Sequence, residues 1–248
     1  MLELGFLDWM LIGLCALLIG FSKSGLPNLV ILAVTLIMFV FPARDSVGFL
    51  LPILLAGDLF AVTYYRRNVV WKYLISLVPW VLIGIIMGFF VLQNIDDAQL
   101  KPVIGVIVLM MIALNFIRQK LGARFNEMLP NSLLFIVFIG ILGGFTTMVG
   151  NAAGAIMTIY LLVKGLPKKE FIGTGAWFFL TVNLIKFPFY VHLDMITFDT
   201  FTVNMMMVPI ILAGAFAGAK ILNFIPQRVF TLLILIFATL GGLNLIFN

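Results

Sequence analysis

Charged side chains are scarce in this 248-residue sequence, at 10% of positions, and cysteine and histidine each occur once. Soluble domains carry about 25% charged residues, so this composition cannot supply a water-facing surface. The lone Cys15 excludes a disulfide framework and a paired-thiol centre. The lone His192 excludes a histidine-rich metal centre. We therefore expect neither a bound metal nor a cofactor.

Apolar residues fill the sequence instead. They make up 63% of it, with 25 phenylalanines and a mean hydropathy of +1.22. A net charge of +5 is also typical of nucleic-acid binders, but most of the basic residues cluster in three short segments between apolar runs. We predict an all-α polytopic protein of the cell (inner) membrane, with the lipid bilayer as partner and no nucleic acid.

Breaking the sequence at charged and Pro/Gly-rich positions leaves ten apolar segments, which are too long and too uniform for strands. They are 6–20, 27–41, 46–65, 73–92, 102–117, 132–144, 152–163, 171–190, 203–222 and 229–247. A membrane-spanning helix needs about 20 residues. The third, fourth, eighth, ninth and tenth segments reach that length, the fifth is a little short, and the first, second, sixth and seventh are clearly short.

Similar residues recur 124 to 130 positions apart, with a drift of only six. The matching pairs are 20–22 with 144–146, 58–59 with 183–184, Pro79 with Pro209, Gly84 with Gly214, and Gly88 with Gly218. The chain therefore divides into two transmembrane repeats, 1–120 and 131–248, joined by a cytoplasmic linker at 121–130.

Loop charge sets the orientation of the repeats. Basic clusters lie at 66–72, 118–124 and 164–169, whereas loops 93–101 and 191–199 are acidic. The basic clusters should be cytoplasmic. This holds only if each pair of short segments crosses the bilayer an even number of times, as two short spans or as one re-entrant hairpin. The two repeats are then inverted, and each has a broken or re-entrant short helix pair followed by three spanning helices.

The two short pairs are interrupted at matching positions, 20–28 and 143–151. Non-helical backbone at membrane depth persists only where protein or a water-filled cavity satisfies its polar groups. Breaks that arrive from opposite faces would meet near the midplane, where the next helices would direct their positive N-termini at one point and so favour an anion. Tight packing by the glycines and capping by the hydroxyls is the alternative. The candidate substrate-binding residues are Ser22, Lys23, Ser24, Asn28, Thr146, Thr147, Asn151 and Lys186.

Asp58 lies deep in the third segment, where a carboxylate is costly and indicates function. It would balance the charge of Lys23 or Lys186, take up a proton as a coupling group, or form a purely structural ion pair. Its repeat counterpart is the neutral Asn183. Lys23 and Lys186 would either contact the ligand or snorkel to an interface.

Catalytic residues are not expected, because no His/Asp cluster, serine–base pair or metal spacing occurs at membrane depth. We expect Trp177 and Tyr190 to serve as packing residues and interfacial anchors. His192 is expected in an outer loop, and Cys15 in the core.

Several motifs resemble those of one family, the TauE/SafE sulfite exporters. They are the two breaks, 42–48 leading to 57–59, and 165–167 leading to 173–177 and 183–186. The resemblance covers nearly the whole chain in both repeats. It implies secondary transport of small sulfur-containing anions: sulfite, thiosulfate, or organosulfonates such as sulfoacetate, isethionate and taurine-derived compounds.

The sequence is thus interpreted as a secondary transporter that works by alternating access around a midplane anion site. A passive anion channel for the same oxyanions uses the same residues and is the alternative. Export and import both fit this pattern, as do a proton and a sodium ion as the coupled ion and any oligomeric state. The absence of a GxxxxGK[ST] motif disfavours a self-contained ATP-driven pump.

Overall fold

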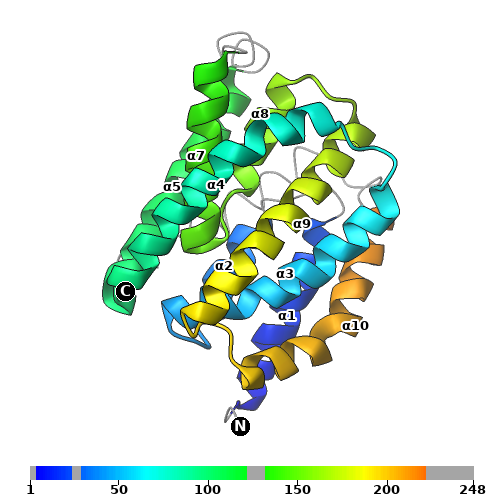
Figure 1. Ribbon diagram of the computed structural model, residues 1–248. Helices are drawn as coiled ribbons and strands as arrows, with labels where there is room; N and C mark the ends of the chain where they lie inside the picture. Colours follow the sequence, from blue (N-terminus) through cyan, green and yellow to red (C-terminus); the bar gives the residue numbers. More distant parts are fainter. Residues whose placement is uncertain (1–3, 24–28, 122–131, 222–248) are drawn as a thin grey trace.

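The computed structural model describes residues 4–23, 29–121 and 132–221. All regular secondary structure in these ranges is helical (Figure 1). The predicted linker beyond Leu121 and the last apolar segment, 229–247, lie outside the described residues, so those two predictions stand as predictions.

The helices follow the order of the predicted segments. In the first predicted repeat they are α1 (Phe6–Ser22), α2 (Leu29–Ile37), α3 (Ala43–Tyr65), α4 (Trp71–Asn94) and α5 (Asp97–Leu121). In the second they are α7 (Leu133–Gly150), α8 (Gly154–Val163), α9 (Lys168–His192) and α10 (Phe198–Ile221). Among the described helices, α3, α4, α7, α9 and α10 are long and apolar enough to cross a membrane. The chain is therefore a multi-pass membrane protein.

The predicted boundary of the sixth segment, 132–144, is wrong. Helix α7 has 18 residues and continues through Gly143 and Gly144 to Gly150. The glycines do not end the helix because they are buried against neighbouring helices, where small residues permit close backbone approach. The hydroxyl of Thr146 donates to the carbonyl of Leu142, 2.9 Å away, and so stays within the helix. The interruption between α7 and α8 is thus confined to 151–153.

The fifth segment is also longer than predicted. Helix α5 has 25 residues, because it begins at Asp97 and continues past the apolar stretch to Leu121. In the acidic loop before it, the Asp96 carboxylate accepts the backbone N–H of Gln99 at 2.8 Å, which caps the first turn. Polar ends therefore extend this helix beyond its hydrophobic middle.

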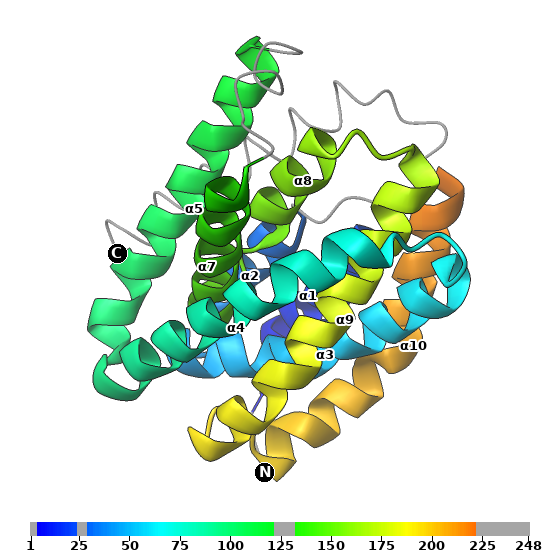
Figure 2. The same ribbon diagram turned by 45° about the horizontal axis from the view of Figure 1, so that its top comes forward.

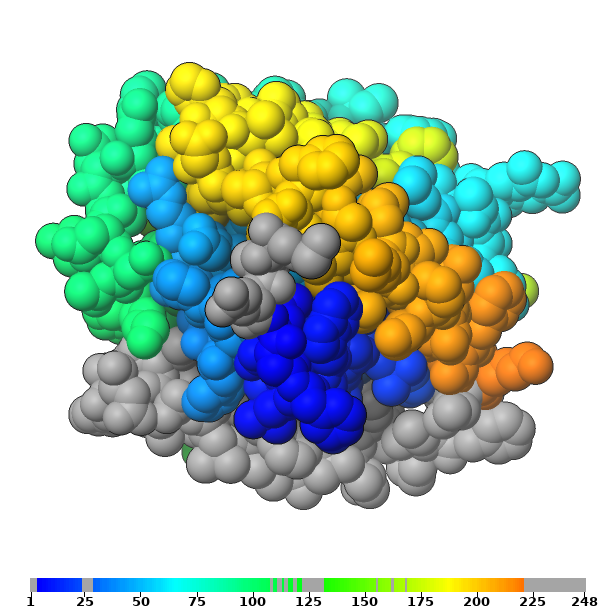
Figure 3. All heavy atoms as spheres, turned by 90° about the horizontal axis from the view of Figure 1, so that it is seen from below, coloured from blue at the N-terminus to red at the C-terminus, as the bar shows by residue number. Residues whose placement is uncertain are grey.

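Two close helix pairs flank a central pair. Helix α1 packs on α10, and α4 packs on α7. Figure 3 shows α1 and α10 adjacent on one face of the molecule. Between these pairs, α3 and α9 lie side by side and run in opposite directions (Figures 1 and 2). The short helices α2 and α8 come after α1 and α7 and bring the chain back to this centre, where the polar residues gather.

Candidate functional site

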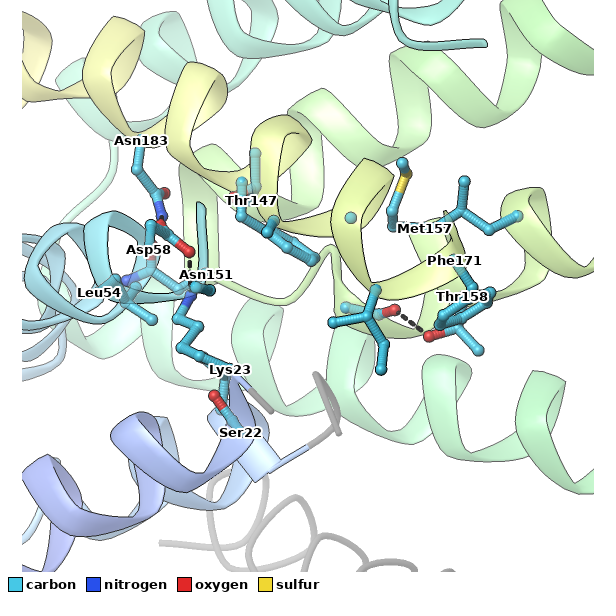
Figure 4. A pocket seen from close by; sticks show the side chains of 18 residues that line it. Ser22, Lys23, Leu54, Asp58, Thr147, Asn151, Met157, Thr158, Phe171 and Asn183 are labelled. Carbon is cyan, nitrogen blue, oxygen red and sulfur yellow. Dashed lines mark hydrogen bonds and ion pairs between the residues drawn. The ribbon is translucent and has the colours of Figure 1, made fainter. Parts of the chain in front are cut away.

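A pocket lies among the end of α1, the middle of α3, α8 and α9 (Figure 4). Its polar lining residues are Ser22, Lys23, Asp58, Thr147, Asn151, Thr158 and Asn183. Its remaining walls are apolar or glycine, including Leu54, Met157, Leu161, Phe171 and Phe179. The pocket therefore has a charged end inside a largely hydrophobic chamber.

Helix periodicity explains which residues reach the pocket. On α8, residues 154, 157, 158 and 161 line it, and this three-and-four spacing selects one helix face. On α9, the lining residues run from Phe171 to Asn183. Twelve residues of helix extend about 18 Å at 1.5 Å per residue. The pocket is therefore elongated along α9.

Lys23 and Asp58 form a buried ion pair at the inner end. Lys23 caps the C-terminus of α1, and its Nζ lies 2.6 Å from Asp58 Oδ1 in the middle of α3. The Lys23 side chain is 6% exposed and that of Asp58 is fully buried. Gly57 leaves room for the lysine stem, because a Cβ there would lie 3.0 Å from Lys23 Cγ. The ring of Phe179 lies 5.2 Å from the ammonium group, within cation–π range.

Asn183 joins this ion pair to a second buried lysine. Its Nδ2 donates to Asp58 Oδ2 at 2.7 Å, and its Oδ1 accepts from Lys186 Nζ at 3.4 Å. Lys186 is fully buried, so snorkelling to an interface is wrong for this residue. It does not line the pocket but lies directly behind it. Lys186 Nζ donates two further hydrogen bonds, to Asn151 Oδ1 at 2.5 Å and to Thr147 Oγ1 at 3.3 Å.

The turn between α7 and α8 supplies those two acceptors. Asn151 ends α7 in the left-handed conformation, with φ of 53°, which asparagine tolerates better than most residues. The Oδ1 atom of Asn151 accepts from Lys186, and its Nδ2 donates to the Val47 carbonyl of α3 at 3.0 Å. Three residues later α8 begins at Gly154, which lines the pocket. The positive end of the α8 dipole therefore faces the same chamber.

The structure brings most of the predicted site residues together. Lys23, Asp58, Thr147, Asn151 and Asn183 all line the pocket. Ser22 lines it too, although its hydroxyl donates to the carbonyl of Ile19 in its own helix at 2.6 Å. Thr146 is not among the lining residues, because its hydroxyl is turned to the backbone of α7. Ser24 and Asn28 lie outside the described residues.

Sequence reasoning missed several contributors. Phe179 and Thr158 line the pocket. Tyr190 is not an interfacial anchor: it is fully buried, its hydroxyl donates to the Met148 carbonyl at 2.6 Å, and its ring lies 5.2 Å from Lys186 Nζ. The signal was the spacing of Phe179, Asn183, Lys186 and Tyr190, which places all four on one face of α9. Cys15 is in the core, as predicted.

A basic residue, Lys164, follows the part of α8 that lines the pocket. Lys164 follows α8 three residues after the lining residue Leu161, and its Nζ lies 5.2 Å from the ring of Tyr160 and 5.4 Å from that of Tyr73. Burial, followed by the nearby charge of Lys72, lowers the pKa of Lys164. Lys164 belongs to one of the basic clusters identified in the sequence.

The arrangement fits a small anion with an apolar portion. One lysine, Lys23, faces the chamber, and a second, Lys186, lies just behind its wall. Buried charge is costly unless it is paired, so an anion is the ligand charge that this centre favours. No nucleophile–base pair is present among the described lining residues.

Comparison with protein-family models identifies one family. The model described as "Sulfite exporter TauE/SafE" matches residues 11–245, nearly the whole chain. Comparison with curated protein sequences gives no match, and comparison with solved structures gives none either.

Proposed function

The chain belongs to the TauE/SafE sulfite exporter family, and we propose that it is a secondary transporter of small sulfur-containing anions in the cell (inner) membrane. Membership makes it a membrane transporter of the sulfite-exporter type. The proposal adds the position of the anion site, the class of anion and the way in which access alternates.

One observation carries the proposal: Lys23 presents a buried cation to an open pocket in the centre of a membrane protein. A charge at membrane depth is costly and is retained where it handles a ligand or an ion. The hydroxyl of Thr147 and the amide of Asn151 line the same end. These groups, together with the N-terminus of α8, suit the oxygens of a sulfite or sulfonate group.

The lining of the pocket favours organosulfonates among these anions. The apolar walls formed by Met157, Leu161 and Phe171 offer no partner to a fully charged inorganic ion. A short carbon chain bearing one sulfonate, as in isethionate, matches both ends of the pocket. Sulfite, thiosulfate and sulfoacetate are the comparison substrates.

Equivalent glycine contacts in the two halves support an inverted repeat. A Cβ at Gly20 would lie 2.0 Å from the carbonyl oxygen of Ile211, and one at Gly144 would lie 2.1 Å from that of Val81. The two glycines are 124 positions apart and the two carbonyls 130 apart, which are the offsets of the sequence repeat. The α1–α10 contact thus corresponds to the α7–α4 contact with the halves exchanged.

Alternating access would follow from moving one repeat against the other around the ion pair. In the present arrangement the pocket runs toward the side of Phe171. On the opposite side of Lys186, the Asn151–Val47 and Tyr190–Met148 hydrogen bonds tie the helices together. These contacts would have to open for the site to reach the other face.

Flux measurements in proteoliposomes test the proposal. The parent protein should carry labelled isethionate, and Lys23→Ala should abolish that flux while expression stays intact. Because removing one partner of a buried ion pair costs about 3–5 kcal/mol, the double variant Lys23→Gln with Asp58→Asn is the companion that leaves no unpaired charge. It should also be inactive. Lys169→Ala, at an exposed lysine, should transport normally. Unchanged flux in both Lys23 variants would remove this residue from the site.

The same experiment separates a carrier from a passive anion channel. A carrier saturates with substrate and shows accelerated exchange when unlabelled isethionate is present on the other side. A channel conducts current far above carrier turnover and shows no accelerated exchange. The second result would replace the transporter proposal while leaving the anion site in place.

A further inference from the structure

The cation that lines the pocket already holds an anion of the chain itself. Lys23 is the only lysine or arginine among the described lining residues, and its Nζ lies 2.6 Å from Asp58 Oδ1. The other carboxylate oxygen accepts from Asn183. A carboxylate is a planar oxyanion that accepts the same hydrogen bonds as a sulfonate. Asp58 therefore occupies the position that a substrate anion needs.

Building on the proposed function, we infer that Asp58 is displaced from Lys23 as its neutral acid, so that each substrate anion binds together with one proton. Lys186 does not line the pocket and bonds three neutral acceptors, so Asp58 and a substrate anion would compete for Lys23 alone. Two anions that share one buried cation cannot both stay ionised without large cost. A sulfonate is a strong acid and keeps its charge, so the proton goes to the carboxylate. Lys23 stays charged and turns to the substrate, and the net charge of the pocket is unchanged for a monoanion.

The hydrogen bonds identify the oxygen that takes the proton. Lys186 is a donor only, so it fixes the amide of Asn183 with Oδ1 toward itself and Nδ2 toward Asp58. Asp58 Oδ2 therefore faces a permanent donor, and a proton on this oxygen would weaken that hydrogen bond. Asp58 Oδ1 loses its partner when Lys23 turns away, and it is the oxygen that becomes protonated.

Few other charges reach this carboxylate. Lys23 contacts Asp58 directly, and Lys186 is linked to it through the Asn183 amide. Two neutral titratable groups on the packed helices bond backbone carbonyls instead: Cys15 contacts Ala33, and Tyr190 contacts Met148. The remaining charged residues of α1, α3, α5, α9 and α10 lie near helix ends: Asp8, Arg44, Asp45, Asp97, Lys101, Arg118, Lys120, Lys168, Lys169, Glu170, His192, Asp199 and Lys220.

Proton-linked displacement has a kinetic and electrical signature. A monoanion that crosses with one proton moves no net charge, so its flux responds to a pH gradient and not to the membrane potential. An acidic outside would then drive accumulation inside. The affinity for isethionate should fall about tenfold per pH unit once Asp58 is ionised in the free protein, as one-proton linkage requires.

The test uses the full-length protein in proteoliposomes with labelled isethionate as the probe. The parent should accumulate the probe when the outside is more acidic and the potential is clamped at zero, with about one proton entering per anion. Asp58→Asn should bind the probe independently of pH and lose accumulation. Asp194→Asn is the matched control, since Asp194 is exposed with φ of 56°, a conformation that asparagine accepts. It should behave as the parent does.

Calorimetric titration keeps the test independent of how the variant folds. Binding of isethionate to the parent protein, measured in two buffers with different ionisation enthalpies, should report uptake of about one proton. Uptake of no proton, or full accumulation by Asp58→Asn, would overturn this inference and leave the transporter intact. If the parent carries none of isethionate, sulfoacetate, sulfite and thiosulfate, the proposed function fails and this inference fails with it.

Discussion

The close approach of α7 to α4 at Gly144 gives a quantitative prediction. A Cβ at Gly144 would lie 2.1 Å from the carbonyl oxygen of Val81, whereas an ordinary contact begins at 3.4 Å. Gly144→Ala must therefore push α7 and α4 apart by more than 1 Å, and a gap of that size forfeits about half of the dispersion energy of each contact it opens. Overpacking of this kind costs about 1–3 kcal/mol.

Gly143→Ala is the matched control one residue earlier. Its Cβ would lie 3.4 Å from Ile156 Cγ2, an ordinary contact. This substitution should be neutral or should stabilise the helix by up to about 1 kcal/mol through propensity. Thermal unfolding in detergent, followed by tryptophan fluorescence, should place the midpoint of Gly144→Ala several degrees below that of Gly143→Ala, at roughly 2–4 °C per kcal/mol. Equal midpoints would refute the packing argument.

Two further changes separate the site from the fold. Asn183→Leu should lower both thermal stability and isethionate affinity, because Asp58 loses a charge-assisted hydrogen bond worth about 1.5–3 kcal/mol. Asn204→Leu removes an equally buried amide outside the pocket, so it should lower stability only; a matching loss of affinity would contradict the assignment. Tyr190→Phe should cost about 1–3 kcal/mol by leaving a buried carbonyl at the end of α7 unsatisfied. Tyr64→Phe, at a side chain that is 59% exposed, should leave the unfolding midpoint unchanged.

Hydropathy alone was enough to predict the fold class, whereas the family was predicted from the motifs in the two repeats. The apolar fraction leaves no other class of protein, and runs of this length form helices because a bilayer demands internal hydrogen bonding. Segment boundaries were less accurate. Gly143 and Gly144 were treated as helix ends, but in a buried helix the missing side chain serves packing, and only the partner helix reveals which role applies.

The polar centre could be predicted in composition but not in its pairings. The rarity of charge at membrane depth identified Lys23, Asp58 and Lys186 from sequence. Which lysine pairs with the carboxylate depends on where α1 ends relative to α3 and α9, and this is a tertiary fact. Lys186 was ambiguous because it lies six residues from the end of α9, near enough to an edge for snorkelling. The turn at Asn151 covers it instead.

The central claim is that the charged end of the pocket holds a sulfonate, and anomalous diffraction from the protein bound to 2-bromoethanesulfonate tests it most directly. The bromine peak should lie among the apolar walls near Phe171 and Met157, with the sulfonate directed at Lys23 Nζ. A pocket without a bromine peak, or a sulfonate that binds away from Lys23, would contradict the account.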